Sequence, residues 1–216
     1  MYKLFFNIVI SLSILGLSAH LSACSSDSET ASLTASVSEL AKVDIASADL
    51  TDEVANGIIF MREEEKLARD VYSYFYEKYQ ARIFTNISRS ETRHMSSVKT
   101  LLERYELEDP ITEDVSGQFV NAELQELYNT LVEQGNESLA AALEVGAIIE
   151  EVDILDLLSN LGLVDAANPD IVSVYANLGK GSESHLKAFV RNLSAQGITY
   201  TPHYLTEEQY IAIIGE

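Results

Sequence analysis

The chain has 216 residues, with 14 Lys plus Arg against 34 Asp plus Glu, a formal net charge of −20, one Cys, three Pro and no Trp. This negative charge repels polyphosphate and no two basic residues are adjacent, so the sequence predicts no nucleic-acid partner. A single Cys excludes a disulfide framework and a thiolate zinc site, and the few Pro and Gly beside many Leu, Ala and Glu predict an all-α fold.

The first element in chain order is a signal peptide, predicted at residues 1–23. Lys3 precedes an apolar run over residues 4–17, which is too short to span a membrane stably. The segment ends in Leu-Ser-Ala-Cys at Cys24, which resembles the lipobox of bacterial lipoproteins. The resemblance implies that Cys24 is lipidated and attaches the protein to a lipid bilayer. The Ser that follows, by resemblance to bacterial sorting signals, implies a cell-envelope lipoprotein on the periplasmic side of the outer membrane in a two-membrane bacterium, or at the cell surface in a one-membrane bacterium. The alternative is a secreted protein with a free thiol.

Residues 24–50 are rich in Ser, Ala, Thr and acidic residues, which predicts a flexible tether after the anchor. A helical bundle is predicted for residues 51–205 and a short C-terminal helix for 206–216. Within the bundle, apolar residues recur every three or four positions, so each helix has one apolar face. The predicted long helices lie near residues 52–80, 86–106, 137–161 and 169–197, with a connecting helix near 121–134.

Each long helix carries a polar interruption in the middle of its apolar face. Glu65 interrupts the first helix, Glu91 and His94 the second, Glu150 the third and His185 the fourth. An isolated buried carboxylate is far too costly for the packing of one helix to offset. A divalent metal resolves the conflict, because carboxylates and imidazoles that project inward from four helices can share one or two cations. The Glu-x-x-His spacing places both of its side chains on one helical face.

These residues resemble those of a known group of proteins. Glu65, Ala68 and Tyr72 match the Glu-x-x-Ala-x-x-x-Tyr of the first helix of rubrerythrin-type proteins, and Glu91 with His94 matches their Glu-x-x-His. The run from Met61 to Tyr72 also resembles the bacterial family known as domain of unknown function 2202. The resemblance implies a ferritin-like four-helix bundle with a carboxylate-bridged dinuclear site, usually of iron or manganese, to which Glu150 and His185 also contribute.

One position departs from that pattern. The resemblance calls for a Glu three residues before His185, and Ser182 stands there instead. Asp153 lies three residues after Glu150 on much the same face and is the substitute ligand that we consider. The site would then hold two metal ions; the alternatives are one ion or none.

Two readings without metal remain open for the same residues. Glu65 or Glu150 would be neutralised by a buried Tyr or by an Arg such as Arg62, Arg69 or Arg93. His185 would be a neutral core residue bonded to a backbone carbonyl.

The leading functional hypothesis is a membrane-anchored, extracytoplasmic metalloprotein that acts in iron handling or in oxidase-like or peroxidase-like reactions. If it is an enzyme, it is a di-iron type oxidoreductase. A rubredoxin-type Cys-x-x-Cys centre is absent from the sequence, so turnover requires an external electron donor. The alternative hypothesis is a metal-free helical adaptor or envelope-stress lipoprotein. A third is cation buffering by surface carboxylates.

Overall fold

A computed structural model of the chain describes residues 50–215. The predicted signal peptide, Cys24 and all but the last residue of the predicted tether lie outside the described residues. The described part contains α1 (Asp52–Tyr79), α2 (Arg82–Arg104), α3 (Ala122–Gly135), α4 (Leu139–Leu161), α5 (Pro169–Ala195) and α6 (Glu207–Ile214). All regular structure in this range is helical, as predicted. None of these helices is both long enough and apolar enough to cross a membrane.

The helix ends follow from local capping. The Thr51 side chain accepts a hydrogen bond from the backbone N–H of Val54 and so begins α1. At the other end, Gln80 adopts a left-handed conformation (φ 54°), and the chain reverses into α2 within two residues. Because the reversal is this short, α2 begins at Arg82, four residues before the predicted start. At the start of α6 the side chains of Thr206 and Gln209 form a capping box.

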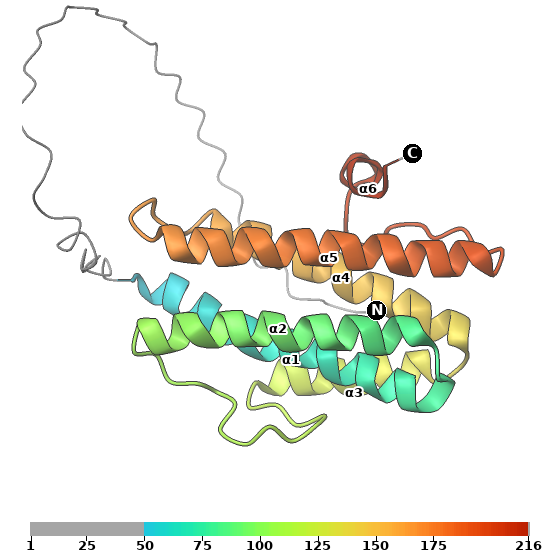
Figure 1. The fold of residues 1–216 in the computed structure, drawn as a ribbon, viewed down its shortest axis with the longest axis horizontal. Helices are drawn as coiled ribbons and strands as arrows, with labels where there is room; N and C mark the ends of the chain where they lie inside the picture. The colour runs from blue at the N-terminus through green and yellow to red at the C-terminus, as the bar shows by residue number, and fades with distance from the viewer. Residues whose placement is uncertain (1–49, 216) are drawn as a thin grey trace, which may run out of the picture. The chain divides into compact units, whose positions relative to one another are not determined.

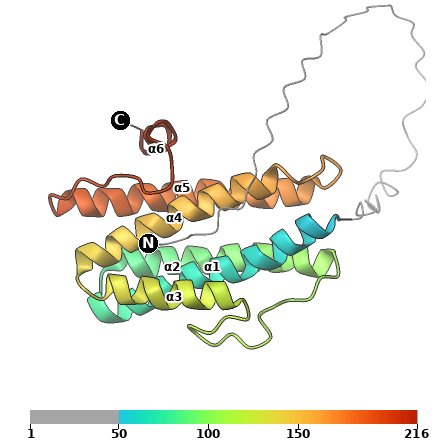
Figure 2. The same ribbon diagram turned by 180° about the vertical axis from the view of Figure 1, so that it is seen from behind.

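The helices form two antiparallel pairs that lie side by side. Figure 1 shows α1 beside α2 and α4 beside α5, and contacts of α2 with α5 and of α1 with α4 join the pairs. The connecting helix α3 packs on α1 and α4. Figure 2, from behind, shows α6 viewed along its axis on the outer side of α5. The arrangement encloses one interior lined by a face of each of the four long helices.

That interior is divided along its length by a polar layer. One apolar cluster includes Tyr72, Phe84 and Phe189, and a second includes Met61 and Leu101. On α1, α2 and α5 the first cluster lies on one side of the polar interruption and the second lies on the other, whereas on α4 the first cluster continues past Glu150 to Ile154. The polar side chains of this layer are nonetheless buried. They are Glu64, Glu65, Glu91, Glu150, Asp153, Ser182 and His185.

The charged residues of α1 next to this layer hold the long segment between α2 and α3. The Arg62 guanidinium donates to Asp109 and to the carbonyl of Met95, and Glu63 accepts from the backbone N–H groups of Val120 and Asn121. Arg62 therefore does not neutralise Glu65 or Glu150.

Two further basic residues of α1 are also engaged elsewhere. Lys66, which is almost fully buried, donates to Asp70 and to the carbonyls of Val115 and Gln118. Arg69 pairs with Asp70 and Asp114. The third Arg proposed from the sequence, Arg93, is exposed on α2. The alternative of an Arg partner for the two glutamates is therefore wrong.

Candidate metal centre

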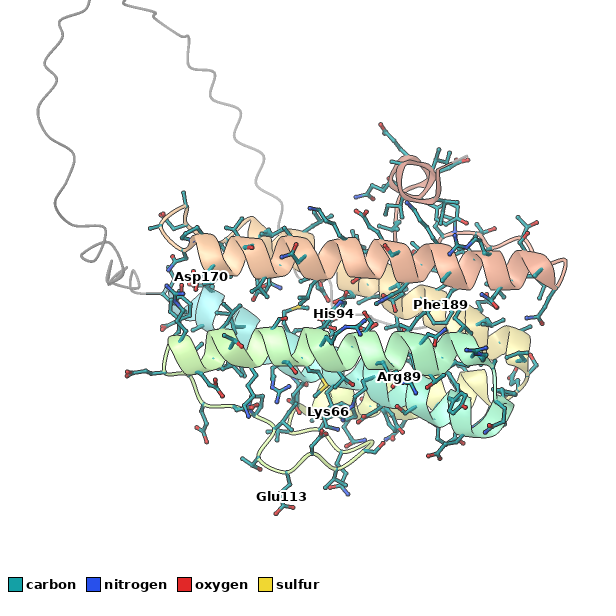
Figure 3. The ribbon with its side chains drawn as sticks, in the orientation of Figure 1. Lys66, Arg89, His94, Glu113, Asp170 and Phe189 are labelled. Carbon is teal, nitrogen blue, oxygen red and sulfur yellow. The ribbon has the colours of Figure 1, made fainter. Side chains whose placement is uncertain are left out.

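The side chains of the predicted site converge from the four long helices. Glu65 comes from α1, Glu91 and His94 from α2, Glu150 from α4 and His185 from α5. Four of them belong to the polar layer, and His94 adjoins it through Glu65 and Glu91. Figure 3 shows His94 between the ribbons of α2 and α5. The site is therefore assembled by tertiary packing rather than by any one helix.

The five residues form two overlapping groups with the donor atoms of a metal site. Glu65, Glu91 and His94 form the first group, and Glu91, Glu150 and His185 form the second. Within each group the ligand-type atoms lie within 4.8 Å of one another. Small shifts of the side chains would bring them within the bond length of about 2 Å of a shared ion.

Glu91 belongs to both groups and lies at their centre. Its Oε2 is 2.7 Å from His94 Nδ1, and its Oε1 is 2.8 Å from His185 Nδ1. Glu65 Oε2 lies 3.2 Å from His94 Nδ1, and Glu150 Oε2 lies 3.4 Å from His185 Nδ1. Each imidazole thus faces Glu91 and one terminal carboxylate. This arrangement suits two cations, with Glu91 as the bridge. In the part of the chain that the structure describes, His185 Nδ1 faces Glu91 and Glu150 and not the backbone carbonyl that the metal-free alternative requires.

A tyrosine from the first helix positions one of the terminal carboxylates. The buried Tyr72 hydroxyl donates to Glu150 Oε1 at 2.6 Å, which leaves Oε2 facing His185. The Tyr partner considered from the sequence is therefore present. Since it occupies one Glu150 oxygen and leaves the other toward the centre, it is compatible with a metal-ligating role. Outer hydrogen bonds of this kind fix the orientation of metal ligands.

Asp153 and Ser182 lie beside the two groups and outside them. The Ser182 hydroxyl donates to Asp153 Oδ2, while Asp153 Oδ1 has no hydrogen-bond partner. Asp153 is buried and close enough for its charge to interact with Glu150. Ser182 stands where the resemblance calls for a fourth-helix Glu. It therefore hydrogen-bonds to Asp153, the carboxylate that we considered as the substitute for that Glu.

A glycine allows α5 to approach α2 at this level. A Cβ added to Gly181 would lie 2.7 Å from both Cε1 and Nε2 of the His94 ring, which is closer than real Cβ contacts. Glycine in a helix interior is unfavourable by about 1 kcal/mol relative to Ala, and the His94 ring explains why it is tolerated here. The two His side chains remain 12% and 11% exposed at this α2/α5 seam, whereas the carboxylates are almost fully enclosed.

Several buried polar atoms of the site lack a hydrogen-bond partner, and for this reason the residues present fit a bound cation. Glu65 Oε1, Glu91 Oε1, Asp153 Oδ1 and His185 Nδ1 are all buried and lack a hydrogen-bond partner, although Glu91 Oε1 and His185 Nδ1 are close together. Buried polar atoms are rarely left unsatisfied in native proteins. Four ionised carboxylates would carry two more charges than two imidazolium rings compensate, and burial accordingly raises the pKa of Glu65, Glu150 and Asp153. A divalent cation would supply both the missing partners and the missing charge.

When no metal is bound, protonated imidazole rings compensate part of the negative charge of the carboxylates. Burial alone would lower the pKa of His94, but Glu65 and Glu91 raise it to about 11. Burial acts the same way on His185, and Glu150 with Glu91 raises the pKa of that ring to about 10. Burial would raise the pKa of Glu91, but the two His rings lower it to about 2. Metal binding must therefore displace protons from the imidazoles.

The metal-free protein should become less stable as pH rises above 6.5. In the unfolded chain His loses its proton near pH 6.5, whereas the folded rings keep theirs to about pH 10 and 11. The stability contributed by these rings is complete below pH 6.5 and is lost as pH rises through their folded pKa values, because the folded state binds more protons in between. We expect the melting temperature of metal-free protein to fall steadily from pH 6.5 to 9.5 in thermal scans. A melting temperature that is constant or rises over this range would contradict the charged-imidazole arrangement.

Comparison with known proteins finds matches that carry no described function. Residues 54–216 match the uncharacterized protein domain DUF2202. A curated relative, the uncharacterized protein MJ0754 of Methanocaldococcus jannaschii, is 50% identical over 166 residues, which is 77% of this chain and 89% of the relative. The crystal structure of hypothetical protein MJ0754 superposes with a TM-score of 0.76 at 48% identity and covers 78% of this chain and 95% of that one.

Proposed function

The chain belongs to the DUF2202 family, and we propose that this member binds iron or manganese through the two Glu/His groups of its interior. The main observation in support of this proposal is the position of Glu91. Its two carboxylate oxygens each lie within 2.8 Å of the Nδ1 atom of a different His. A bridging carboxylate with a separate imidazole on each side is the arrangement that a pair of divalent cations requires.

We also propose that the bundle is ferritin-like. In carboxylate-bridged dinuclear proteins of that fold, four helices each project ligands inward at the same level. Here α1, α2, α4 and α5 do so. The connecting helix α3 lies between the two pairs in the sequence. The position of Ser182 removes one bridging carboxylate, so the proposed centre has Glu91 as its bridge, with Glu65 and Glu150 as terminal ligands.

The chemistry that fits this donor set is iron handling or oxidase-like or peroxidase-like reaction with dioxygen or peroxide. Mixed carboxylate and imidazole ligands suit iron and manganese, and a bound redox metal would supply the electron transfer. The protein residues hold the ions, and His94 and His185, whose side chains are 12% and 11% exposed, lie nearer to solvent than the carboxylates do. Electrons would come from an external donor.

Metal analysis after reconstitution tests the proposal. Protein incubated anaerobically with Fe²⁺ or Mn²⁺ and then desalted should retain one to two equivalents. Combined Glu91→Ala and His94→Ala replacement should reduce this below a tenth of an equivalent. As the matched control we choose Glu183→Ala, a carboxylate of α5 outside both groups, which should retain the wild-type amount. Wild-type protein that holds less than a tenth of an equivalent would instead favour the metal-free adaptor. Many weak sites that survive the double replacement would favour surface buffering.

We propose in addition that the protein is an envelope lipoprotein anchored through Cys24. The supporting observations are the apolar leader and the Leu-Ser-Ala-Cys sequence. The family match begins at residue 54, after the predicted anchor and tether. Replacing Cys24 with Ser should move the protein from the membrane fraction to the soluble fraction of the cell envelope. Unchanged membrane fractionation of the variant would exclude lipidation as the anchor.

A further inference from the structure

A second carboxylate pair lies next to the Glu/His centre, formed by Glu64 of α1 and Asp156 of α4. Glu64 directly precedes Glu65 in α1, and Asp156 lies about one helical turn after Asp153 in α4, so the pair adjoins the polar layer on both helices. The Glu64 side chain is buried, with 8% of the residue exposed, whereas Asp156 is only partly buried. The two carboxyl groups lie within hydrogen-bonding reach of each other. The pair thus extends from the polar layer toward solvent.

Within residues 50–215 this pair has no basic partner. Glu64 Oε2 lacks a hydrogen-bond donor, and neither carboxyl group is within ion-pair distance of a Lys, Arg or His. The nearest basic residues along α1, Arg62 and Lys66, are bound to Asp109 and Asp70. Two facing carboxyl groups require a proton or a cation between them, because two bare charges in this position would repel each other strongly.

Other polar oxygen atoms lie beyond Glu64, on the side away from the Glu/His centre. Gly57 lies two turns before Glu64 on the same face of α1, and a Cβ at this position would collide with Asn160 Oδ1 and lie 3.9 Å from the Tyr175 hydroxyl. The Tyr175 hydroxyl is buried, has no hydrogen-bond partner and is close enough to Glu64 to interact with its charge. Unpaired oxygens of α1 and α5 are therefore gathered in an otherwise apolar part of the interior.

We propose that Glu64 and Asp156 form a transfer site, through which divalent cations pass from the surface to the Glu/His centre. The inference rests on the proposed metal-binding function. Oxygen ligands alone hold a divalent cation that keeps part of its water shell, and they hold it less tightly than sites that add imidazole. A cation on Asp156 can move to Glu64 and then to Asp153 or Glu65, whose charges already interact with Glu64. A cation that binds the pair releases to solvent any proton that the two carboxyl groups share, and each later step exchanges one metal–ligand bond for another.

The competing reading is that a proton is shared within the pair. Burial raises the pKa of Glu64 well above its usual range, and the charge of Asp156 raises it further, so a proton occupies the pair when no cation does. The two readings differ in kinetics. A pair that only stores a proton has no effect on the rate at which metal reaches His94 and His185, whereas a transfer site does.

Stopped-flow loading with Co²⁺ distinguishes these readings. Imidazole coordination gives Co²⁺ visible absorption bands that report arrival at the centre. Full-length Glu64→Gln and Asp156→Asn variants should load at least tenfold more slowly than wild type and reach the same final absorbance. The matched control is Glu53→Gln, an exposed carboxylate of the first turn of α1, which should load at the wild-type rate. If Glu64→Gln does not fold, as judged by circular dichroism, the partly exposed Asp156→Asn variant carries the test alone.

Three outcomes would overturn the transfer site. Variants that load at the wild-type rate would refute it while leaving the metal centre intact. Variants with a lower final absorbance would show that the pair holds resident metal rather than passing it on. Wild-type protein that develops no imidazole-dependent bands would refute the proposed centre itself, and the transfer site with it.

Discussion

Replacing Glu91 with Gln should remove both metal ions at once and weaken binding at least about 100-fold, more than the loss of an outer hydrogen bond does. Glu91 is the only residue that belongs to both ligand groups of the described chain, and each of its oxygens faces a different imidazole. Gln keeps the shape of the side chain but loses its charge and offers a single oxygen. Isothermal titration with Mn²⁺, followed by metal analysis, measures the loss.

The matched variant is Glu150→Gln. Glu150 belongs to one group only, and Tyr72 donates to its Oε1, so the Gln side chain can keep that bond. This variant should lose one ion and keep the one bound by Glu65, Glu91 and His94. Two bound ions in Glu91→Gln, or equal losses in the two variants, would contradict the bridging role of Glu91.

Replacing Glu151 with Ala should destabilise the fold by about 3–5 kcal/mol, because it removes the acceptor of several hydrogen bonds and each buried donor left unsatisfied costs about 1–3 kcal/mol. Glu151 is fully buried and accepts hydrogen bonds from the Tyr200 hydroxyl and from the backbone N–H groups of His203, Tyr204 and Leu205. The change leaves these donors without their acceptor and frees the C-terminal segment from α4. Urea unfolding of the metal-free protein measures the free-energy change.

The control for this variant is Glu144→Ala. Glu144 lies two turns earlier on the same face of α4, but it is exposed, and its only ion-pair contact is with His203 at 3.5 Å. Its replacement should change stability by less than about 0.5 kcal/mol, as is usual for exposed sites. Limited proteolysis should cut residues 196–206 faster in Glu151→Ala than in either wild type or the control. Equal stability of the two variants would show that Glu151 does not anchor the C-terminal segment.

The pattern of apolar residues in the sequence predicts the helices and most of the candidate site. Periodicity fixes which face of a helix is buried, so Glu65, Glu91, Glu150 and His185 could be assigned to the interior before any packing was known. Capping residues fix the ends, and Pro169 correctly predicts the start of α5. These features are local, which is why sequence alone was sufficient for them.

Contacts between distant segments were not predictable in this way. Glu150 and Glu151 are adjacent, and periodicity assigns only Glu150 to the interior. Glu151 is nevertheless buried, because residues 200–205 cover that side of α4, and no local pattern indicates this contact. Similarly, the bond between Ser182 and Asp153 depends on the packing of α4 against α5. The run of acidic residues around Glu64 was a visible signal, but its buried pairing with Asp156 required the structure.

We propose that Glu91 bridges two cations between His94 and His185, and anomalous diffraction from crystals soaked in Mn²⁺ would locate those cations. The expected result is two anomalous peaks on either side of the Glu91 carboxylate. One peak should lie about 2 Å from His94 Nδ1 and the other about 2 Å from His185 Nδ1. The contradictory result is an anomalous map without peaks in the interior, in crystals where both imidazoles still contact Glu91 directly.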